Sequence, residues 1–133
     1  METIFSKIIK GTLPSFKVAE SKDFLAFLDI NPNQTGHTLC VTKKEQDKFL
    51  DLSVADYQKL MFFSRKVALA IQETIPCKRV GMSIIGLEVP HVHVHLIPLN
   101  LIKDATFQSK VETTPEQLAQ TALAIAKVFQ NLP

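Results

Sequence analysis

Three of the four histidines of this chain lie within five residues, as His91, His93 and His95. If the segment from Val89 to Leu99 is a strand, alternation places the three imidazole rings on one face of a sheet. Neighbouring histidines are then about 6.5 to 7 Å apart at Cα. Packing alone seldom explains three imidazoles on one face, so the pattern indicates a site that does chemistry.

Two kinds of chemistry use such a face. In one, a ring nitrogen acts as a nucleophile or general base, while the neighbouring rings orient it and bind anionic oxygens. In the other, the histidines hold a metal such as zinc, with a third protein ligand supplied by His37, Glu88 or His91. The spacing of the histidines does not distinguish the nucleophilic site from the metal site.

The composition is that of an ordinary globular protein. With 133 residues, of which 46% are hydrophobic and 21% charged, the chain is expected to form one domain over residues 1–133. A net charge of +2 is too small to favour nucleic acid or an anionic membrane as a partner, but it is compatible with a nucleotide-sized anion. No apolar run approaches the roughly 20 residues of a membrane-spanning helix. The start of the chain lacks a basic targeting region, and Cys40 and Cys77 form no Cys-x-x-Cys pair, so we expect a cytoplasmic protein with free thiols.

Apolar spacing and turn residues predict the elements that must position the histidines. A short helix is expected over residues 4–9, and a long helix begins after its cap Ser53 and ends at Pro76. A last helix starts with Thr114-Pro115 and runs over about residues 115–130. Strands are expected over residues 16–20, 24–29, 37–42, 79–85 and 89–99. This order of elements predicts an α+β fold with an antiparallel sheet.

Four motifs resemble those of the histidine-triad (HIT) family. The run His91-Val92-His93-Val94-His95-Leu96-Ile97-Pro98 is similar to the H-x-H-x-H-x-x signature of that family. Residues 4–15 resemble its N-terminal helix, residues 25–32 its nucleoside-binding strand, and residues 36–39 the strand with its fourth histidine. The motifs cover roughly residues 4–99, and the C-terminal helix lies outside them. The resemblance implies the HIT fold, with about five antiparallel strands and one long helix, and it implies a homodimer.

The resemblance also implies a role for each histidine. His93 would be the nucleophile whose Nε2 attacks the α-phosphorus of a nucleotide ester or amide, giving a nucleotidyl-histidine intermediate. The Nδ1 of His93 would bond the backbone carbonyl of His91, and His95 would contact the non-bridging phosphate oxygens. His91 and His37 would form the polar shell behind them, a surface loop being the alternative for His37. This chemistry requires no metal or other cofactor.

For the nucleoside, the resemblance implies a purine nucleotide similar to AMP or GMP, with a phosphoramidate as the first choice. Asp29 would accept hydrogen bonds from the ribose hydroxyls, although an aspartate at a strand end also serves simply to end pairing. The base pocket would be lined by residues that are equally typical of a core: Ile4, Phe5, Ile8, Phe27 and Ile30.

The sequence departs from the family pattern just before the triad. Where the family usually has Gly-Gln-Ser/Thr-Val, this chain has Gly86-Leu87-Glu88-Val89. Gly86 and Glu88 are expected near the phosphate, but the Leu87 side chain donates no hydrogen bond, and Glu88 brings a negative charge that would favour a cationic leaving group. Ser6 stands where some bacterial members have a zinc-binding Cys-x-x-Cys, so a structural zinc is not expected. Glu45 stands in place of an accessory histidine.

Two other functions stay open at this point. The altered Leu87-Glu88 segment is compatible with a nucleotide-binding module of little catalytic power, which predicts affinity without turnover. A zinc-dependent hydrolase or lyase predicts stoichiometric zinc in the purified protein and loss of activity with a chelator.

Overall fold

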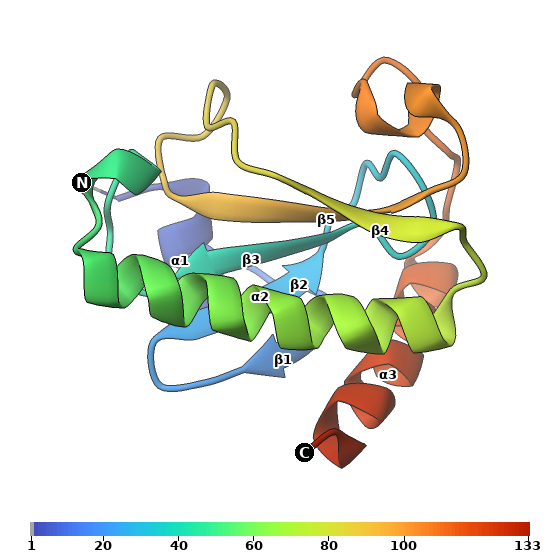
Figure 1. Cartoon of the computed structure of the whole chain (residues 1–133), viewed down its shortest axis with the longest axis horizontal. Helices are drawn as coiled ribbons and strands as arrows, with labels where there is room; N and C mark the ends of the chain where they lie inside the picture. The colour runs from blue at the N-terminus through green and yellow to red at the C-terminus, as the bar shows by residue number, and fades with distance from the viewer. Residues whose placement is uncertain (1) are drawn as a thin grey trace.

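The computed structural model describes residues 2–133 and has an α+β architecture (Figure 1). Five antiparallel strands form one sheet in the order β1-β2-β3-β5-β4. The strands are β1 (Lys17–Glu20), β2 (Phe24–Leu28), β3 (Thr38–Thr42), β4 (Arg79–Ser83) and β5 (His93–Leu99). The helices are α1 (Ile4–Lys10), α2 (Val54–Thr74) and α3 (Pro115–Asn131), with short 3₁₀ helices at η1 (Phe49–Asp51) and η2 (Ile102–Ala105). The predicted fold class and the predicted order of elements are confirmed.

The two longer helices begin at the caps that the sequence predicts. The Ser53 hydroxyl accepts the amide N–H of Asp56 at the start of α2. Thr114 and Gln117 form a capping box at the start of α3. Helix α2 ends just before Pro76, because the residue that precedes a proline disfavours the helical conformation.

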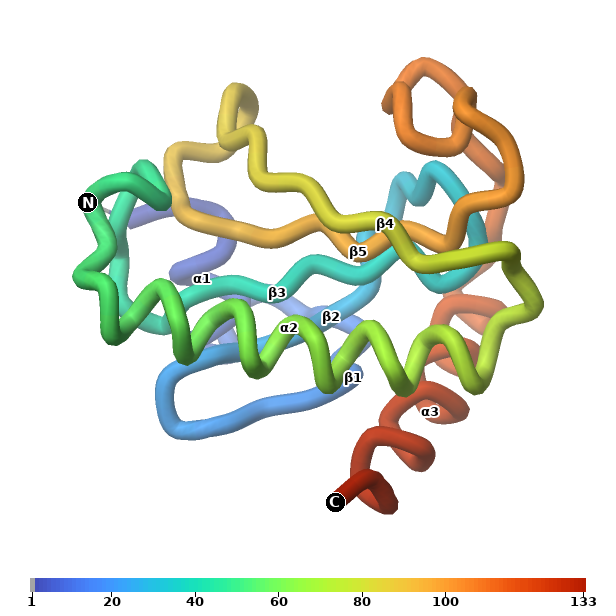
Figure 2. Tube along the Cα trace, in the orientation of Figure 1, coloured from blue at the N-terminus to red at the C-terminus, as the bar shows by residue number. Residues whose placement is uncertain are grey.

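The sheet separates two apolar clusters. Helices α2 and α3 lie over one face of the sheet (Figure 2). Their apolar side chains pack on those of the sheet. Helix α1 packs on the other face, against a smaller cluster made of Phe5, Leu25, Phe27, Leu39 and Val41. Alternation along β5 sends Val94 and Leu96 to the first cluster and turns His93 toward Phe5 in the second. The histidine face of β5 is therefore the face that α1 covers.

The predicted strand from Val89 to Leu99 is too long at its start, because β5 begins at His93. Pro90 has no N–H for strand pairing, and the N–H of His91 turns back to the carbonyl of Val89 over 2.8 Å. His91 still lies on the same face as His93, since Phe5 contacts both rings. The other four strands are one or two residues shorter than predicted.

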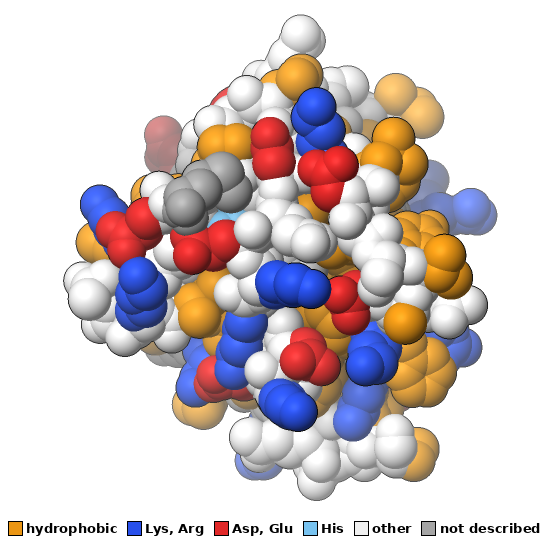
Figure 3. All heavy atoms as spheres, turned by 90° about the vertical axis from the view of Figure 1, so that its left-hand side faces the viewer, with side chains coloured by type: hydrophobic (Ala, Val, Ile, Leu, Met, Phe, Trp, Pro, Cys, Tyr) orange, Lys and Arg blue, Asp and Glu red, His pale blue; other side chains and the backbone are white. Residues whose placement is uncertain are grey.

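The two outer strands of the sheet differ in their surroundings. Strand β1 is packed against α3, whereas no segment of the described chain pairs with the outer edge of β4. Acidic and basic side chains are mixed over the face shown in Figure 3, in keeping with the net charge of +2. Within residues 2–133, no helix is long and apolar enough to cross a membrane.

Candidate active site

His93 is held against the backbone of the residue two positions before it. Its Nδ1 lies 2.6 Å from the carbonyl oxygen of His91. A carbonyl oxygen only accepts hydrogen bonds, so Nδ1 carries the proton of the neutral ring and Nε2 carries a lone pair. The ring is buried, and Phe5 packs edge-on against it with centroids 4.9 Å apart. These contacts fix both the orientation and the tautomer of a nucleophilic nitrogen.

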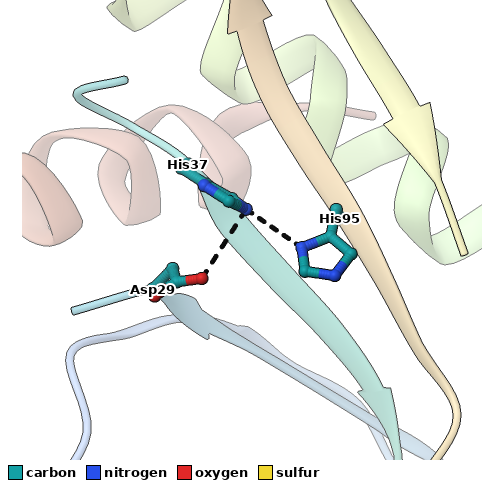
Figure 4. A group of neighbouring side chains, drawn as sticks. All are labelled: Asp29, His37 and His95. Carbon is teal, nitrogen blue, oxygen red and sulfur yellow. Dashed lines mark hydrogen bonds and ion pairs between the residues drawn. The ribbon is translucent and has the colours of Figure 1, made fainter. Parts of the chain in front are cut away.

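His37 and His95 face each other through their ring nitrogens (Figure 4). Their hydrogen-bond partners again determine which nitrogen of each ring carries the proton. The amide N–H of Asn33 donates to Nδ1 of His37 over 3.0 Å, so the proton of His37 is on Nε2. That Nε2 lies 3.0 Å from Nδ1 of His95 and donates to it, which leaves the proton of His95 on its own Nε2. His95 therefore offers an N–H donor, and its ring centroid lies 4.9 Å from that of His93.

His91 is bonded at both of its ring nitrogens. Nε2 lies 2.7 Å from the carbonyl oxygen of Thr42 and donates to it. Nδ1 lies 2.7 Å from the Thr3 hydroxyl, which donates to it. The side chain is fully buried. His91 and His37 thus stand behind the other two histidines, and the alternative of a surface loop for His37 is wrong, because His37 is also fully buried.

The four histidines have eight ring nitrogens, and six of them have hydrogen-bond partners within residues 2–133. The other two are Nε2 of His93 and Nε2 of His95. The first carries a lone pair and the second carries a proton. One nucleophile beside one donor suits attack on a centre whose oxygens gain negative charge.

The positions of the ring protons also argue against a zinc site made of histidines. Asp29, His37 and His95 each place one potential ligand atom within 4.8 Å of the others. A neutral histidine that binds metal through Nε2 carries its proton on Nδ1, where it donates to an acceptor. Nδ1 of His37 faces the N–H of Asn33 instead, so Nε2 of His37 has no free lone pair. The hydrogen bonds around this cluster do not fit a metal.

Burial keeps the histidines neutral. Desolvation lowers the pKa of His37 to about 3 and that of His95 to about 4, and in each case a neighbouring histidine adds to the shift. Desolvation also lowers the pKa of His93, while its bond to the His91 carbonyl opposes that shift. All three imidazoles are therefore uncharged at pH 7, as nucleophilic attack by His93 requires.

The predicted base-pocket residues divide into a buried group and an exposed group. Phe5 and Phe27 pack edge-on with centroids 5.6 Å apart, and Ile8 lies against them. Ile4 is 51% exposed and Ile30 is 71% exposed, so their side chains are accessible to a ligand. The buried Phe5 and Phe27 and the partly buried Ile8 also serve as core residues, which was the alternative expected from the sequence.

Asp29 lies just beyond the end of β2. Its Oδ1 accepts the amide N–H of Asn31 over 2.9 Å, and its Oδ2 lies 3.7 Å from Nε2 of His37. Desolvation raises the pKa of its carboxyl group. One carboxylate oxygen is thus used by the loop, and the other faces the histidines.

Within residues 2–133, the side chains of the segment before the triad make no hydrogen bond or ion pair with the histidines. Gly86 has a φ of 73°, which is in the left-handed region that favours glycine. Leu87 is 89% exposed, and Glu88 is exposed and makes no hydrogen bond or ion pair within residues 2–133. The negative charge of Glu88 still acts on the site, because it raises the pKa values of Asp29 and His93.

The sequence analysis missed Phe107 and Lys110, which lie in the loop between η2 and α3. The Phe107 ring packs edge-on against His95, with centroids 4.8 Å apart, and it also contacts His37. Lys110 Nζ donates to Oδ1 of Asn33 over 2.8 Å. The φ of Phe107 is 64°, a conformation that costs a non-glycine residue about 1–2 kcal/mol, so its contacts hold it in place. No motif or periodicity marks this loop, and only the structure reveals its position.

Comparison with known proteins agrees with this geometry. The sequence model of the HIT domain matches residues 10–102 of the chain. The chain belongs to the HIT family. It is 40% identical over 96 residues to adenosine 5′-monophosphoramidase HNT1 of Saccharomyces cerevisiae, a match that covers 71% of this chain and 61% of that protein. It is 38% identical over 99 residues to adenosine 5′-monophosphoramidase hnt1 of Schizosaccharomyces pombe, with 74% of each chain covered.

The HIT fold extends beyond the segment that the family model matches. The crystal structure of a HIT-like protein from Bartonella henselae superposes with a TM-score of 0.83 at 27% identity. The superposition covers 96% of both chains, so it reaches into α3. The C-terminal helix, which lies outside the sequence motifs, is thus shared with another HIT protein.

Replacement of Phe107 by alanine tests its role as a cover of the histidine pair. Water then reaches His95, and we expect the pKa of His95 to rise from about 4 toward its ordinary value. The measurement is an NMR titration of the imidazole C–H signals. Phe62→Ala is the matched control, because Phe62 is 77% exposed on α2, away from the site. An unchanged titration of His95 in Phe107→Ala would contradict the assignment.

Proposed function

We propose that this HIT protein is a hydrolase or transferase that acts at the α-phosphate of a purine nucleoside monophosphate derivative, with an adenosine 5′-phosphoramidate as the first choice. The proposal rests on the ordered protons that leave a lone pair on Nε2 of His93 beside an N–H on Nε2 of His95. The phosphoramidase activity in the names of the two yeast relatives supports this choice of substrate. We expect the enzyme to act in the cytoplasm.

The reaction proceeds in two steps. Nε2 of His93 forms a bond to the α-phosphorus while the P–N bond of the phosphoramidate breaks, and the leaving amine takes the electron pair of that bond and a proton from solvent. Water then attacks the phosphorus of the nucleotidyl-histidine, the bond to Nε2 breaks, and the nucleoside monophosphate leaves. The N–H of His95 donates to a non-bridging oxygen as its negative charge increases.

The nucleoside lies on the side of Asp29 in this proposal. The Oδ2 atom of Asp29, which the loop leaves free, accepts from the ribose hydroxyls. The base packs on the accessible side chains of Ile4 and Ile30 at the margin of the Phe5 cluster. The negative charge of Glu88 favours a leaving group that becomes a cation, such as an amine.

A nucleotide-binding module with little turnover is the second candidate. It is favoured by the exposed Leu87 and Glu88 side chains, which supply no donor to a phosphate or a leaving group. The two candidates share the pocket and differ only in the rate of the chemical step.

Single-turnover hydrolysis of adenosine 5′-phosphoramidate separates the candidates. With a chelator present, we expect the wild-type protein to release AMP and His93→Ala to lose at least about 10³-fold in rate, because the variant lacks the attacking nitrogen. The measurement is quenched-flow chromatography of AMP, with AMP affinity determined by calorimetry as the control for folding. AMP binding without turnover in the wild type would favour the binding module instead.

We also propose that the protein is a homodimer that pairs through the outer edge of β4. This edge has no partner within residues 2–133, and Met82 on β4 is 47% exposed. An open strand edge of this kind is a template for pairing with a second chain.

Light scattering after gel filtration tests the dimer. We expect the mass of two chains for the wild type and of one chain for Met82→Asp, because the new charge opposes close contact at the edge. Leu123→Asp is the control, since Leu123 is 72% exposed on α3 and its substitution should preserve the dimer. A wild-type monomer, or a dimer that Met82→Asp does not weaken, would count against this interface.

A further inference from the structure

Polar side chains from distant parts of the sequence form a chain of close contacts next to the triad. The Thr3 hydroxyl oxygen lies 2.7 Å from Nδ1 of His91 and 3.1 Å from the Ser6 hydroxyl oxygen. The Ser6 hydroxyl in turn lies 2.6 Å from Oε2 of Glu45. Thr3, Ser6 and His91 are buried, whereas Glu45 is exposed. The chain therefore runs from the molecular surface at Glu45 to the first histidine of the triad.

The two ends of this chain set the position of every proton along it. Since Nε2 of His91 donates to the carbonyl of Thr42, Nδ1 of the neutral ring has no proton, and the Thr3 hydroxyl donates to it. An ionised Glu45 only accepts, so the Ser6 hydroxyl donates to the carboxylate. Both hydroxyl protons are then in use, so the two hydroxyl oxygens, 3.1 Å apart, do not bond each other. Thr3 and Ser6 are joined instead by the capping box, in which the amide N–H of Ser6 donates to Thr3 Oγ1 over 3.1 Å and the amide N–H of Thr3 donates to Ser6 Oγ over 3.0 Å.

Thr3 consequently has two tasks. As the N-cap it starts α1, the helix that brings Phe5 into contact with the ring of His93. As the donor to His91 it holds the residue whose carbonyl orders the proton of His93. One hydroxyl thus connects the nucleoside side of the site to its nucleophile.

We infer that Thr3 is a positioning residue that holds the His91 carbonyl, and through it the His93 nucleophile, in a fixed position relative to α1. Ser6, oriented by Glu45, holds Thr3 through the two amide bonds of the capping box. Ser6 and Glu45 act on Thr3 alone, so their removal should matter less than that of Thr3. The kinetic part of this inference rests on the proposed function. The part that concerns the ring proton of His93 does not depend on the proposed function.

Thr3→Val tests the inference, because valine has the shape of threonine but cannot donate to His91. We expect the single-turnover rate constant with adenosine 5′-phosphoramidate to fall about tenfold, the effect of one buried nitrogen left without its donor. We expect the affinity for AMP to change less than the rate constant. The Nδ1–H signal of His93 should exchange with water faster in the NMR spectrum. Thr3→Ser restores the hydroxyl and should recover the rate to within about twofold.

Thr114→Val is the matched control for loss of a helix cap. Thr114 caps α3 with a capping box of the same kind, and within residues 2–133 it makes no hydrogen bond to a histidine. Thr114→Val should lose the stability to urea that a helix cap contributes, and Thr3→Val should lose that and more, because it also leaves a buried His91 nitrogen without its donor. Thr114→Val should nevertheless keep the wild-type rate constant and the wild-type His93 signal. Equal losses of rate in the two variants would reduce Thr3 to a stability role and overturn the inference.

The outcomes separate this inference from the proposed function. A wild-type protein without turnover refutes the proposed activity, and the His93 signal in Thr3→Val then decides the inference alone. If Thr3→Val has the wild-type rate constant and the wild-type His93 signal, the inference about Thr3 is overturned. If Thr3→Val does not fold, Ser6→Ala takes its place, with an expected loss of about threefold and faster exchange at His93; a wild-type result there also overturns the inference.

Discussion

The hydrogen bond between Nδ1 of His93 and the carbonyl of His91, 2.6 Å long, is the interaction on which the rest of the site depends. A neutral imidazole has one ring proton, and a carbonyl only accepts, so this bond places the lone pair on Nε2. The bond fixes the lone pair in this way only while the carbonyl of His91 stays in place. His91 is held by the carbonyl of Thr42 at the end of β3 and by Thr3 at the start of α1. The sheet and the N-terminal helix therefore meet at the residue that orders the ring proton of His93.

A polar network of this kind is tolerated in an interior only if its members are satisfied. The backbone supplies the fixed partners: the N–H of Asn33 for His37, and the carbonyls of His91 and Thr42 for His93 and His91. The buried side-chain atoms without a partner within residues 2–133, Gln46 Oε1 and Ser64 Oγ, lie outside the network. Burial then acts in favour of the chemistry, because it lowers the pKa values of His37, His93 and His95 and leaves the rings uncharged. For His93 the same burial favours the neutral, nucleophilic form of the ring.

Local patterns in the sequence were enough to predict most of the fold. Capping residues located the starts of α2 and α3, and alternation of side chains placed His93 and His95 on one face of β5. The start of β5 was predicted four residues early, because the pattern of alternating residues continues through Pro90 although its missing N–H interrupts pairing. Family motifs pointed to Asp29 and His37, but they did not give the hydrogen bonds of His37, which come from the loop amide of Asn33 and from His95, 58 residues away.

What the sequence did not reveal depends on contacts between distant segments. Phe107 reaches His95 only because the loop after η2 folds back over the sheet, and its left-handed backbone has no signature in the residue type. Thr3 was not singled out in the sequence: its capping of α1 and its 2.7 Å approach to a histidine 88 residues away are both seen only in the structure. Side chains that act on a site from loops and caps are therefore the ones that a motif search misses.

The proton positions on the four imidazoles can be measured directly. Long-range ¹H–¹⁵N correlation spectra of the uniformly labelled protein at neutral pH distinguish a protonated ring nitrogen from one with a lone pair. The account predicts that His93 carries its proton on Nδ1, whereas His37, His91 and His95 carry theirs on Nε2. A proton on Nε2 of His93, or a His37 protonated on Nδ1, would contradict it, because the site would then lack its single nucleophilic lone pair or would be open to a metal.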